Sequence, residues 1–195
     1  MADIYLQSSP HIRGKDSIES VMYNVLIALA PATALSIVFF GLDALFVILT
    51  AVLASLGFEA ISLKLAGKPV RGGTLDGSIL ITAVLLAMNL PSGIPLWMVV
   101  LGAFVAVVFG KHSFGGLGNN PFNPALVARV FLLISFPTAL TTWPAMETDA
   151  VTGATPLGLF RAEGGLEKLA LWLSEGGYMN LFTGNVSGSL GEVSV

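Results

Sequence analysis

Long runs of uncharged, apolar residues are the feature that most limits how this chain can fold. Residues 21–40 carry no charge, residues 44–63 carry only Glu59, and residues 77–110 form a third run without any charge. A helix rises about 1.5 Å per residue, so about twenty such residues cross the roughly 30 Å hydrocarbon core of a bilayer. We therefore expect an integral membrane protein whose first partner is the lipid bilayer.

The composition excludes the main alternatives. Charged residues make up 11% of the chain and hydrophobic residues 54%, and the mean hydropathy is +0.83. Soluble domains carry about 25% charged residues, so this chain lacks the polar coat of a water-facing protein. Nine basic against twelve acidic residues predict no nucleic-acid partner, and a chain without cysteine offers no thiolate to a metal or an iron–sulfur cluster. We assign no metal site.

The apolar runs predict an all-α membrane domain of about five transmembrane or half-spanning helices. We expect these helices near residues 20–41, 43–64, 77–90, 95–110 and 124–140. Pro31 should kink the first helix. Residues 91–95, Pro-Ser-Gly-Ile-Pro, divide the longest run into two pieces of about 14 residues, which is short for a crossing. These pieces fit a re-entrant pair, tilted short spans, or helices inside a thicker bundle.

Loop charges predict the orientation. A cytoplasmic N-terminus and five crossings place most basic residues inside, as the positive-inside rule requires. The inner residues would be Arg13, Lys15, Lys64, Lys68, Arg71 and Lys111, and the outer ones Arg161 and Lys168. The chain then divides into a cytoplasmic segment 1–19, a membrane domain 20–140 and an extracytoplasmic loop 141–195 that includes the start of the next segment. Residues 165–175 of this loop fit a short amphipathic helix.

The outer loop contains one motif with chemical meaning. Residues 149–155, Asp-Ala-Val-Thr-Gly-Ala-Thr, follow the pattern D-x-x-T-G-A-T. A threonine hydroxyl can form a phosphoester, and small neighbours let such a loop enter the active site of another enzyme. Taken alone, the motif is explained as well by a turn in which Asp149 and Thr152 bond the backbone.

Four segments carry a family resemblance when they are taken in order. They are Thr74-Leu75-Asp76-Gly77-Ser78, the loop 115–126 (Gly-Gly-Leu-Gly-Asn-Asn-Pro-Phe-Asn-Pro-Ala-Leu), residues 149–156, and Gly188-Ser189-Leu190-Gly191-Glu192-Val193-Ser194. Together they closely resemble the NqrB/RnfD family, and within it the D subunits of Rnf-type electron-transport complexes. The resemblance implies one repeat of an inverted-repeat, transporter-like fold. Members carry about five more helices after the last segment, so we expect the N-terminal half to two-thirds of such a subunit: a fragment, a split gene product or a truncated form.

The resemblance also implies a covalent cofactor. FMN would be joined to Thr155 through a phosphoester, and Asp149, Thr152, Gly153 and Ala154 would be recognised by a flavin transferase. The chain would then be a flavoprotein and a redox subunit of a translocase, with no catalytic residue of its own, rather than an enzyme by itself.

The resemblance further implies a place and partners. The complex lies in the bacterial or archaeal cytoplasmic membrane, moves electrons between ferredoxin and NAD, and translocates Na⁺ or H⁺. The partners would be the other membrane subunits, a second flavinylated subunit, and the subunits that interact with NADH and ferredoxin. The Thr155 loop would be extracytoplasmic.

The loop before the fifth predicted helix is a second candidate site. Its asparagines offer amide groups, which both donate and accept hydrogen bonds. Relatives of this family include a sodium-pumping subunit with non-covalent riboflavin, and its asparagines match Asn120 and Asn123. We therefore consider these two residues as riboflavin ligands. Asn123 would also serve as the helix N-cap without any ligand, and Asn119 fits a simple turn.

Three charged residues lie in or beside the predicted spans. Arg129 is inside the fifth, where an unpaired charge costs a few kcal/mol. It either balances an anionic flavin or pairs with Glu59 or Asp76, and pairing is the favoured interpretation. Glu59 could steer a cation or lie at the wet interface beside Lys64. Asp76 could steer a cation or cap the helix that follows.

A function from another class also fits the sequence. Helices interrupted by proline are typical of channels and secondary transporters, which use them to place backbone dipoles around a solute. The chain could then be half of such a protein without any redox cofactor, and a scaffold for other subunits is a third interpretation. A bound flavin distinguishes these alternatives.

Overall fold

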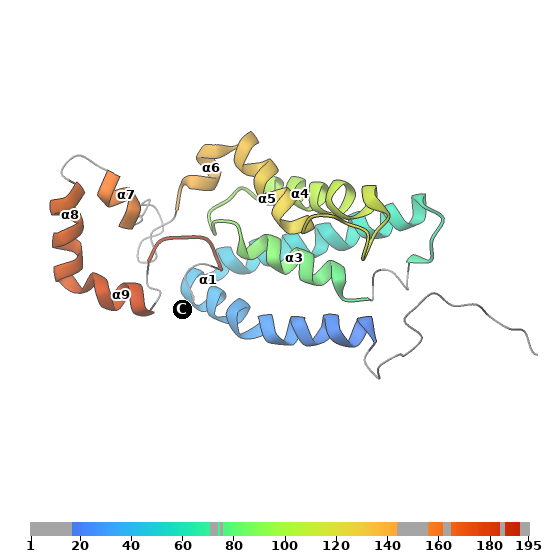
Figure 1. The fold of residues 1–195 in the computed structure, drawn as a ribbon, viewed down its shortest axis with the longest axis horizontal. Coiled ribbons are helices and arrows are strands. Elements are labelled where there is room, and N and C mark those ends of the chain that lie inside the picture. Colours follow the sequence, from blue (N-terminus) through green and yellow to red (C-terminus); the bar gives the residue numbers. More distant parts are fainter. Residues whose placement is uncertain are drawn as a thin grey trace, which may run out of the picture.

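The fold is known from a computed structural model that describes residues 17–70, 74, 76–143, 156–161, 165–183 and 186–191. Within these ranges all regular secondary structure is helical, which confirms the all-α class for the described part of the chain (Figure 1). Two helices there, Ile18–Leu65 and Leu96–Phe114, are long and apolar enough to cross a membrane. The five-span count and the inverted repeat stay predictions.

The first two predicted helices form one hairpin, α1 (Ile18–Leu65). It begins after Ser17, whose hydroxyl accepts a hydrogen bond from the Ser20 amide at 3.1 Å. Gly41 interrupts it with φ 66° and ψ −147°, a backbone conformation that favours glycine. The chain reverses there, so the blue and cyan halves of α1 run in opposite directions in Figure 1. The backbone stays helical at Pro31, so the break falls at Gly41 and not at the proline.

Two of the predicted boundaries are wrong. The helices after α1 are α3 (Ser78–Met88), α4 (Leu96–Phe104), the π-helix η1 (Val105–Lys111), the 3₁₀ turn η2 (His112–Phe114), α5 (Pro124–Ser135) and α6 (Pro137–Thr141). The fourth segment is not a short piece, because α4, η1 and η2 continue without a break for 19 residues. The fifth ends at Ser135 because Phe136 (φ −136°, ψ 60°) precedes a proline and leaves the helical region.

Small residues bring these helices close together. The buried core includes Ala44, Ala51, Leu86, Ala103, Ala125, Ala128 and Leu132. α1 packs mainly on α3 and α4, and η1 packs on α5. A Cβ atom on Gly110 would lie 2.8 Å from the Cα atom of Pro124, so the two backbones touch where η1 ends and α5 begins. Small residues permit such close approach between helices in apolar surroundings.

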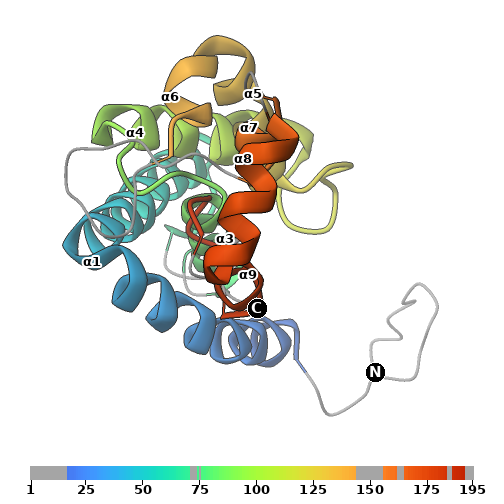
Figure 2. The same cartoon turned by 90° about the vertical axis from the view of Figure 1, so that its left-hand side faces the viewer.

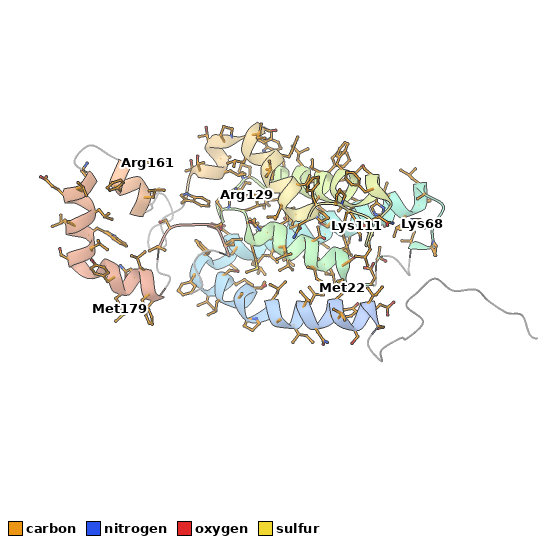
Figure 3. The ribbon with its side chains drawn as sticks, in the orientation of Figure 1. Met22, Lys68, Lys111, Arg129, Arg161 and Met179 are labelled. Carbon is orange, nitrogen blue, oxygen red and sulfur yellow. The ribbon has the colours of Figure 1, made fainter. Side chains whose placement is uncertain are left out.

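The two ends of the bundle differ in character. Lys68 lies just past α1, and its ammonium donates to the carbonyl of Gly115 at 3.4 Å, so the lysines of both loops share one end. Figure 3 shows Lys68 and Lys111 toward this end. At the other end the rings of Trp97 and Phe136 meet edge to face, with centroids 5.3 Å apart. The lysines and the aromatic pair thus lie at opposite ends of the bundle, as the predicted orientation requires. Which end faces the cytoplasm stays a prediction.

The C-terminal third forms short helices and then returns to the bundle. α7 (Pro156–Arg161), α8 (Gly165–Trp172), the π-helix η3 (Leu173–Gly177) and α9 (Tyr178–Thr183) lie at the end where α1 turns (Figures 1 and 2). A helix predicted over 165–175 is therefore present. The Leu190 amide donates to the carbonyl of Leu90 at 3.1 Å, and Gly191 donates to Met88 at 2.7 Å. Leu190 is buried, so the Gly-Ser-Leu-Gly segment is part of the bundle core.

Candidate functional site

A buried carboxylate with two partners lies at the lysine-rich end. Glu59, on the second half of α1, accepts a hydrogen bond on Oε1 from the Lys111 ammonium at 2.7 Å. Its Oε2 lies 2.8 Å from Nε2 of His112. The Lys111 and Glu59 side chains are 4% and 2% exposed, and that of His112 is 14% exposed. Both carboxylate oxygens are therefore used, as a buried charge requires.

The same ammonium continues the network to α3. Lys111 also donates to the hydroxyl of Ser78 at 2.9 Å, and that hydroxyl donates to Oδ1 of Asp76 at 2.7 Å. Asp76 accepts a second bond from the Ser78 amide at 2.9 Å, at the start of α3. The N-cap of α3 is Gly77 rather than the predicted Asp76, which lies one residue earlier and bonds the first residue of the helix. Asp76, Ser78, Lys111, Glu59 and His112 form one hydrogen-bonded chain, which we call the polar chain.

A change of helix type accompanies this geometry. The helix widens into the π form over Val105–Lys111 and tightens into a 3₁₀ turn at His112–Phe114. Two consecutive side chains, Lys111 and His112, reach the same carboxylate at this transition. Short π segments inside helices are frequent at functional sites.

A pocket lies beside the polar chain, between the start of α3, the end of η1 and the loop before α5. Its volume is about 300 Å³, the lower end of the range for small-molecule sites. Its polar lining consists of Ser78, Thr82, Lys111, Asn120 and Asn123, and its apolar lining of Met22, Ile81, Leu85, Leu117 and Pro124. Figure 3 shows Met22 of α1 and Lys111 on opposite sides of α3 near its start. An apolar wall with one polar edge suits a flat, partly polar ring system.

The two predicted riboflavin ligands line this one pocket. The Asn120 amide nitrogen donates to the carbonyl of Phe122 at 2.9 Å. The Asn123 side-chain oxygen accepts from the Ala125 amide at 3.0 Å, which confirms its role as N-cap of α5. Within the described residues, the side-chain oxygen of Asn120 and the side-chain nitrogen of Asn123 have no hydrogen-bond partner, so each retains one group for a ligand. The pocket therefore fits the polar edge of a flavin.

The expectations for Glu59 and Arg129 need correction. Glu59 is 1% exposed, so its placement at a wet interface beside Lys64 is wrong. The favoured interpretation paired Arg129 with Glu59 or Asp76, but the ion-pair partners found for Glu59 are Lys111 and His112, and Asp76 bonds Ser78. Arg129 is not among the pocket-lining residues, and Lys111 is the cation that lines the pocket. Figure 3 shows Arg129 farther than Lys111 from the end of the bundle that carries Lys68.

The flavinylation motif lies outside the described residues. This applies to Asp149, Thr152, Gly153, Ala154 and Thr155, whose roles stay predictions. The description resumes at Pro156, the residue after the candidate threonine, where α7 begins.

Sequence reasoning missed the contributions of Lys111 and His112. In the sequence, Lys111 counts only as a charge for the orientation, and His112 is a single histidine to which we give no metal role. A usable signal was present: an acidic residue inside an apolar run needs a cation, and Lys111-His112 ends another apolar run without an acidic neighbour.

The fold and the site are those of a helical membrane protein with a polar pocket at one end of its bundle. A family model described as the NQR2, RnfD, RnfE family matches residues 5–195. The chain belongs to this family, which confirms the resemblance seen in the sequence. Family membership and the apolar helices together support a location in a membrane.

Named relatives extend the comparison. The chain is 42% identical over 193 residues to the D subunit of the proton-translocating ferredoxin:NAD(+) oxidoreductase complex of Clostridium ljungdahlii, covering 97% of this chain and 58% of that protein. It is 44% identical over 196 residues to the D subunit of the Na(+)-translocating ferredoxin:NAD(+) oxidoreductase complex of Acetobacterium woodii, covering 98% of this chain and 58% of that protein. It is also 44% identical to the D subunit of the ion-translocating oxidoreductase complex of Halorhodospira halophila over 166 residues, which is 85% of this chain and 44% of that protein. The chain thus spans little more than half the length of the first two relatives.

Proposed function

We propose that this chain is the flavin-carrying membrane part of an Rnf-type complex that couples electron transfer between ferredoxin and NAD to Na⁺ or H⁺ translocation. The observation that supports this function is the 42–44% identity, over nearly the whole chain, to two proteins named as the D subunits of ferredoxin:NAD(+) oxidoreductase complexes. One of those names specifies protons and the other Na⁺, so the proposal assigns no ion. The partners are the other subunits of the complex.

The first part of the proposal concerns Thr155. Its hydroxyl attacks the pyrophosphate of FAD in the transferase, a new O–P bond forms, the bond between the two phosphates breaks, and AMP leaves with the threonine proton released. Gly153 and Ala154 keep the loop small enough for such an active site, and the chain has no cysteine for a thioether link. Once attached, the flavin supplies reversible electron transfer, which the surrounding protein adjusts.

Mass spectrometry of the peptide 149–161 tests this assignment. Thr155→Val keeps the branched shape and removes the hydroxyl, so we expect the covalent flavin mass to disappear while the protein still folds. Thr152→Val is the matched control and should only reduce the fraction of modified protein, since its role is recognition. Full modification of the Thr155→Val protein would show that another residue carries the FMN.

The second part concerns a non-covalent flavin in the pocket. Asn120 and Asn123 would bind the polar edge of the ring, the apolar lining from Ile81 and Leu85 would cover its hydrocarbon part, and Lys111 would lie within the same wall. Ser78 and Lys111 are themselves buried within this wall. The amide groups match the polar edge of the flavin and the apolar lining matches its hydrocarbon part, and this match supports the proposal.

A further inference from the structure

The polar chain connects solvent to the pocket. His112 is its partly exposed end, with 14% of the side chain accessible, while Glu59 and Lys111 are almost fully buried. At the other end, Lys111 and Ser78 are both in the pocket wall. Each link is a hydrogen bond of 2.7–2.9 Å. In such a row each hydrogen bond polarises the next, so a change of charge at one end is felt as a change in electrostatic potential at the other.

The charges of the polar chain do not balance when His112 is neutral. Two carboxylates, Glu59 and Asp76, then share a single ammonium, that of Lys111. An ionised carboxylate only accepts hydrogen bonds, so Nε2 of a neutral His112 donates its hydrogen to Glu59 and Nδ1 remains open to a proton. Protonation of His112 brings the net charge of the polar chain from −1 to zero.

The elements packed around the polar chain carry other titratable or charged side chains. In the described residues these are Glu19, Tyr23, Asp43 and Lys64 on α1, Lys68 after it, and Arg129 on α5. None of these is among the residues that line the pocket. A negative charge added to the pocket therefore interacts most closely with the polar chain, because Lys111 and Ser78 lie in the pocket wall.

We propose that the polar chain couples the pocket to proton uptake from solvent, so that a ligand gaining negative charge beside Lys111 draws one proton onto His112. The inference rests on the proposed non-covalent flavin as that ligand. Two electrons come from a soluble donor of the dithionite class. One proton taken up by the ligand itself leaves it with one net negative charge, and the second proton, held on Nδ1 of His112, balances that charge.

A redox titration at several pH values tests the proposal. The full protein is purified in detergent in a Thr155→Val background, so that only non-covalent flavin contributes to the signal. His112→Gln keeps a donor for Glu59 but does not titrate. We expect the midpoint potential of the Thr155→Val protein to fall more steeply with pH than that of the His112→Gln variant. The difference should approach one proton per two electrons, about 30 mV per pH unit, at pH values where His112 is neutral in the oxidised protein and protonated in the reduced protein.

The control and the outcomes separate this inference from the function on which it rests. Lys68→Gln removes a cation at the same end of the bundle, outside the polar chain, and should keep the original slope. Where the glutamine variant does not fold, His112→Asn takes its place. Equal slopes with and without His112 overturn the inference and leave the pocket flavin standing. Absence of any flavin from the Thr155→Val protein overturns the pocket function and the inference together.

Discussion

Replacing Lys111 by methionine tests how much the buried ion pair stabilises the lysine-rich end of the bundle. Methionine keeps most of the apolar stem and removes the ammonium that lies 2.7 Å from Oε1 of Glu59 and 2.9 Å from Oγ of Ser78. Removing one partner of a buried pair costs about 3–5 kcal/mol because the other charge stays buried. His112 still bonds Oε2 of Glu59, so we expect about 3 kcal/mol, the low end of this range.

A double-mutant cycle turns this expectation into a measurement of coupling. Glu59→Gln removes the opposite charge, and the combination with Lys111→Met leaves neither member of the pair ionised. The double variant should therefore be destabilised by less than the sum of the two single variants. The assay is unfolding in mixed detergent micelles followed by circular dichroism. Lys64→Met is the matched control, because Lys64 is exposed in the last turn of α1, and it should stay within about 0.5 kcal/mol of the parent.

Two results would refute the argument about the ion pair. One is a Lys111→Met protein whose unfolding free energy matches that of the Lys64→Met control. The other is strict additivity of the two single substitutions, which would mean that Glu59 and Lys111 do not interact despite the 2.7 Å contact.

Two further predictions use the contact between η1 and α5 and the pocket beside it. Gly110→Ala should cost about 1–3 kcal/mol in the same unfolding assay, because the new Cβ would lie 2.8 Å from the backbone of Pro124. Gly57→Ala has nothing within 4 Å and should stabilise α1 by up to about 1 kcal/mol, so equal effects would contradict the packing argument. Replacing Asn120 and Asn123 by leucine should release non-covalent flavin on purification and leave covalent flavin in place. Because losing a cap costs about 1 kcal/mol, Asn123→Ser, which keeps a capping oxygen, separates folding from binding, and unchanged flavin content in the double leucine variant would exclude the site.

Local sequence patterns predicted the features that depend on local physics. The apolar runs determined where helices form, and the Asn123-Pro124 pair determined where α5 begins. The Asp76 side chain, followed by Gly77, likewise marked the start of α3. Each of these depends on residues within a turn of one another, so a single sequence is enough to identify them.

The site itself depends on contacts that no local pattern specifies. Glu59 and Lys111 are 52 residues apart, and any of several basic residues could have neutralised the carboxylate. The sequence offered Arg129 and Lys64 as neighbours, yet the π-helix η1, which ends at Lys111, brings Lys111 to the carboxylate instead. The contact between Leu190 and the end of α3 is also long-range. It is made by backbone N–H and C=O groups, which nearly all residue types share, so no residue pattern identifies it.

The end of the bundle that holds the pocket differs from the end at which α7 lies. The pocket is at the end where α1 finishes and α5 begins, beside Lys111 and the polar chain. α5 then runs 12 residues, about 18 Å, toward the end that carries Trp97 and Phe136. The described chain resumes after Thr155 with α7, which lies at this second end (Figure 1). The pocket flavin would have the polar chain in its wall. On this arrangement, proton uptake at His112 should accompany reduction of the pocket flavin and be unaffected by the loss of Thr155.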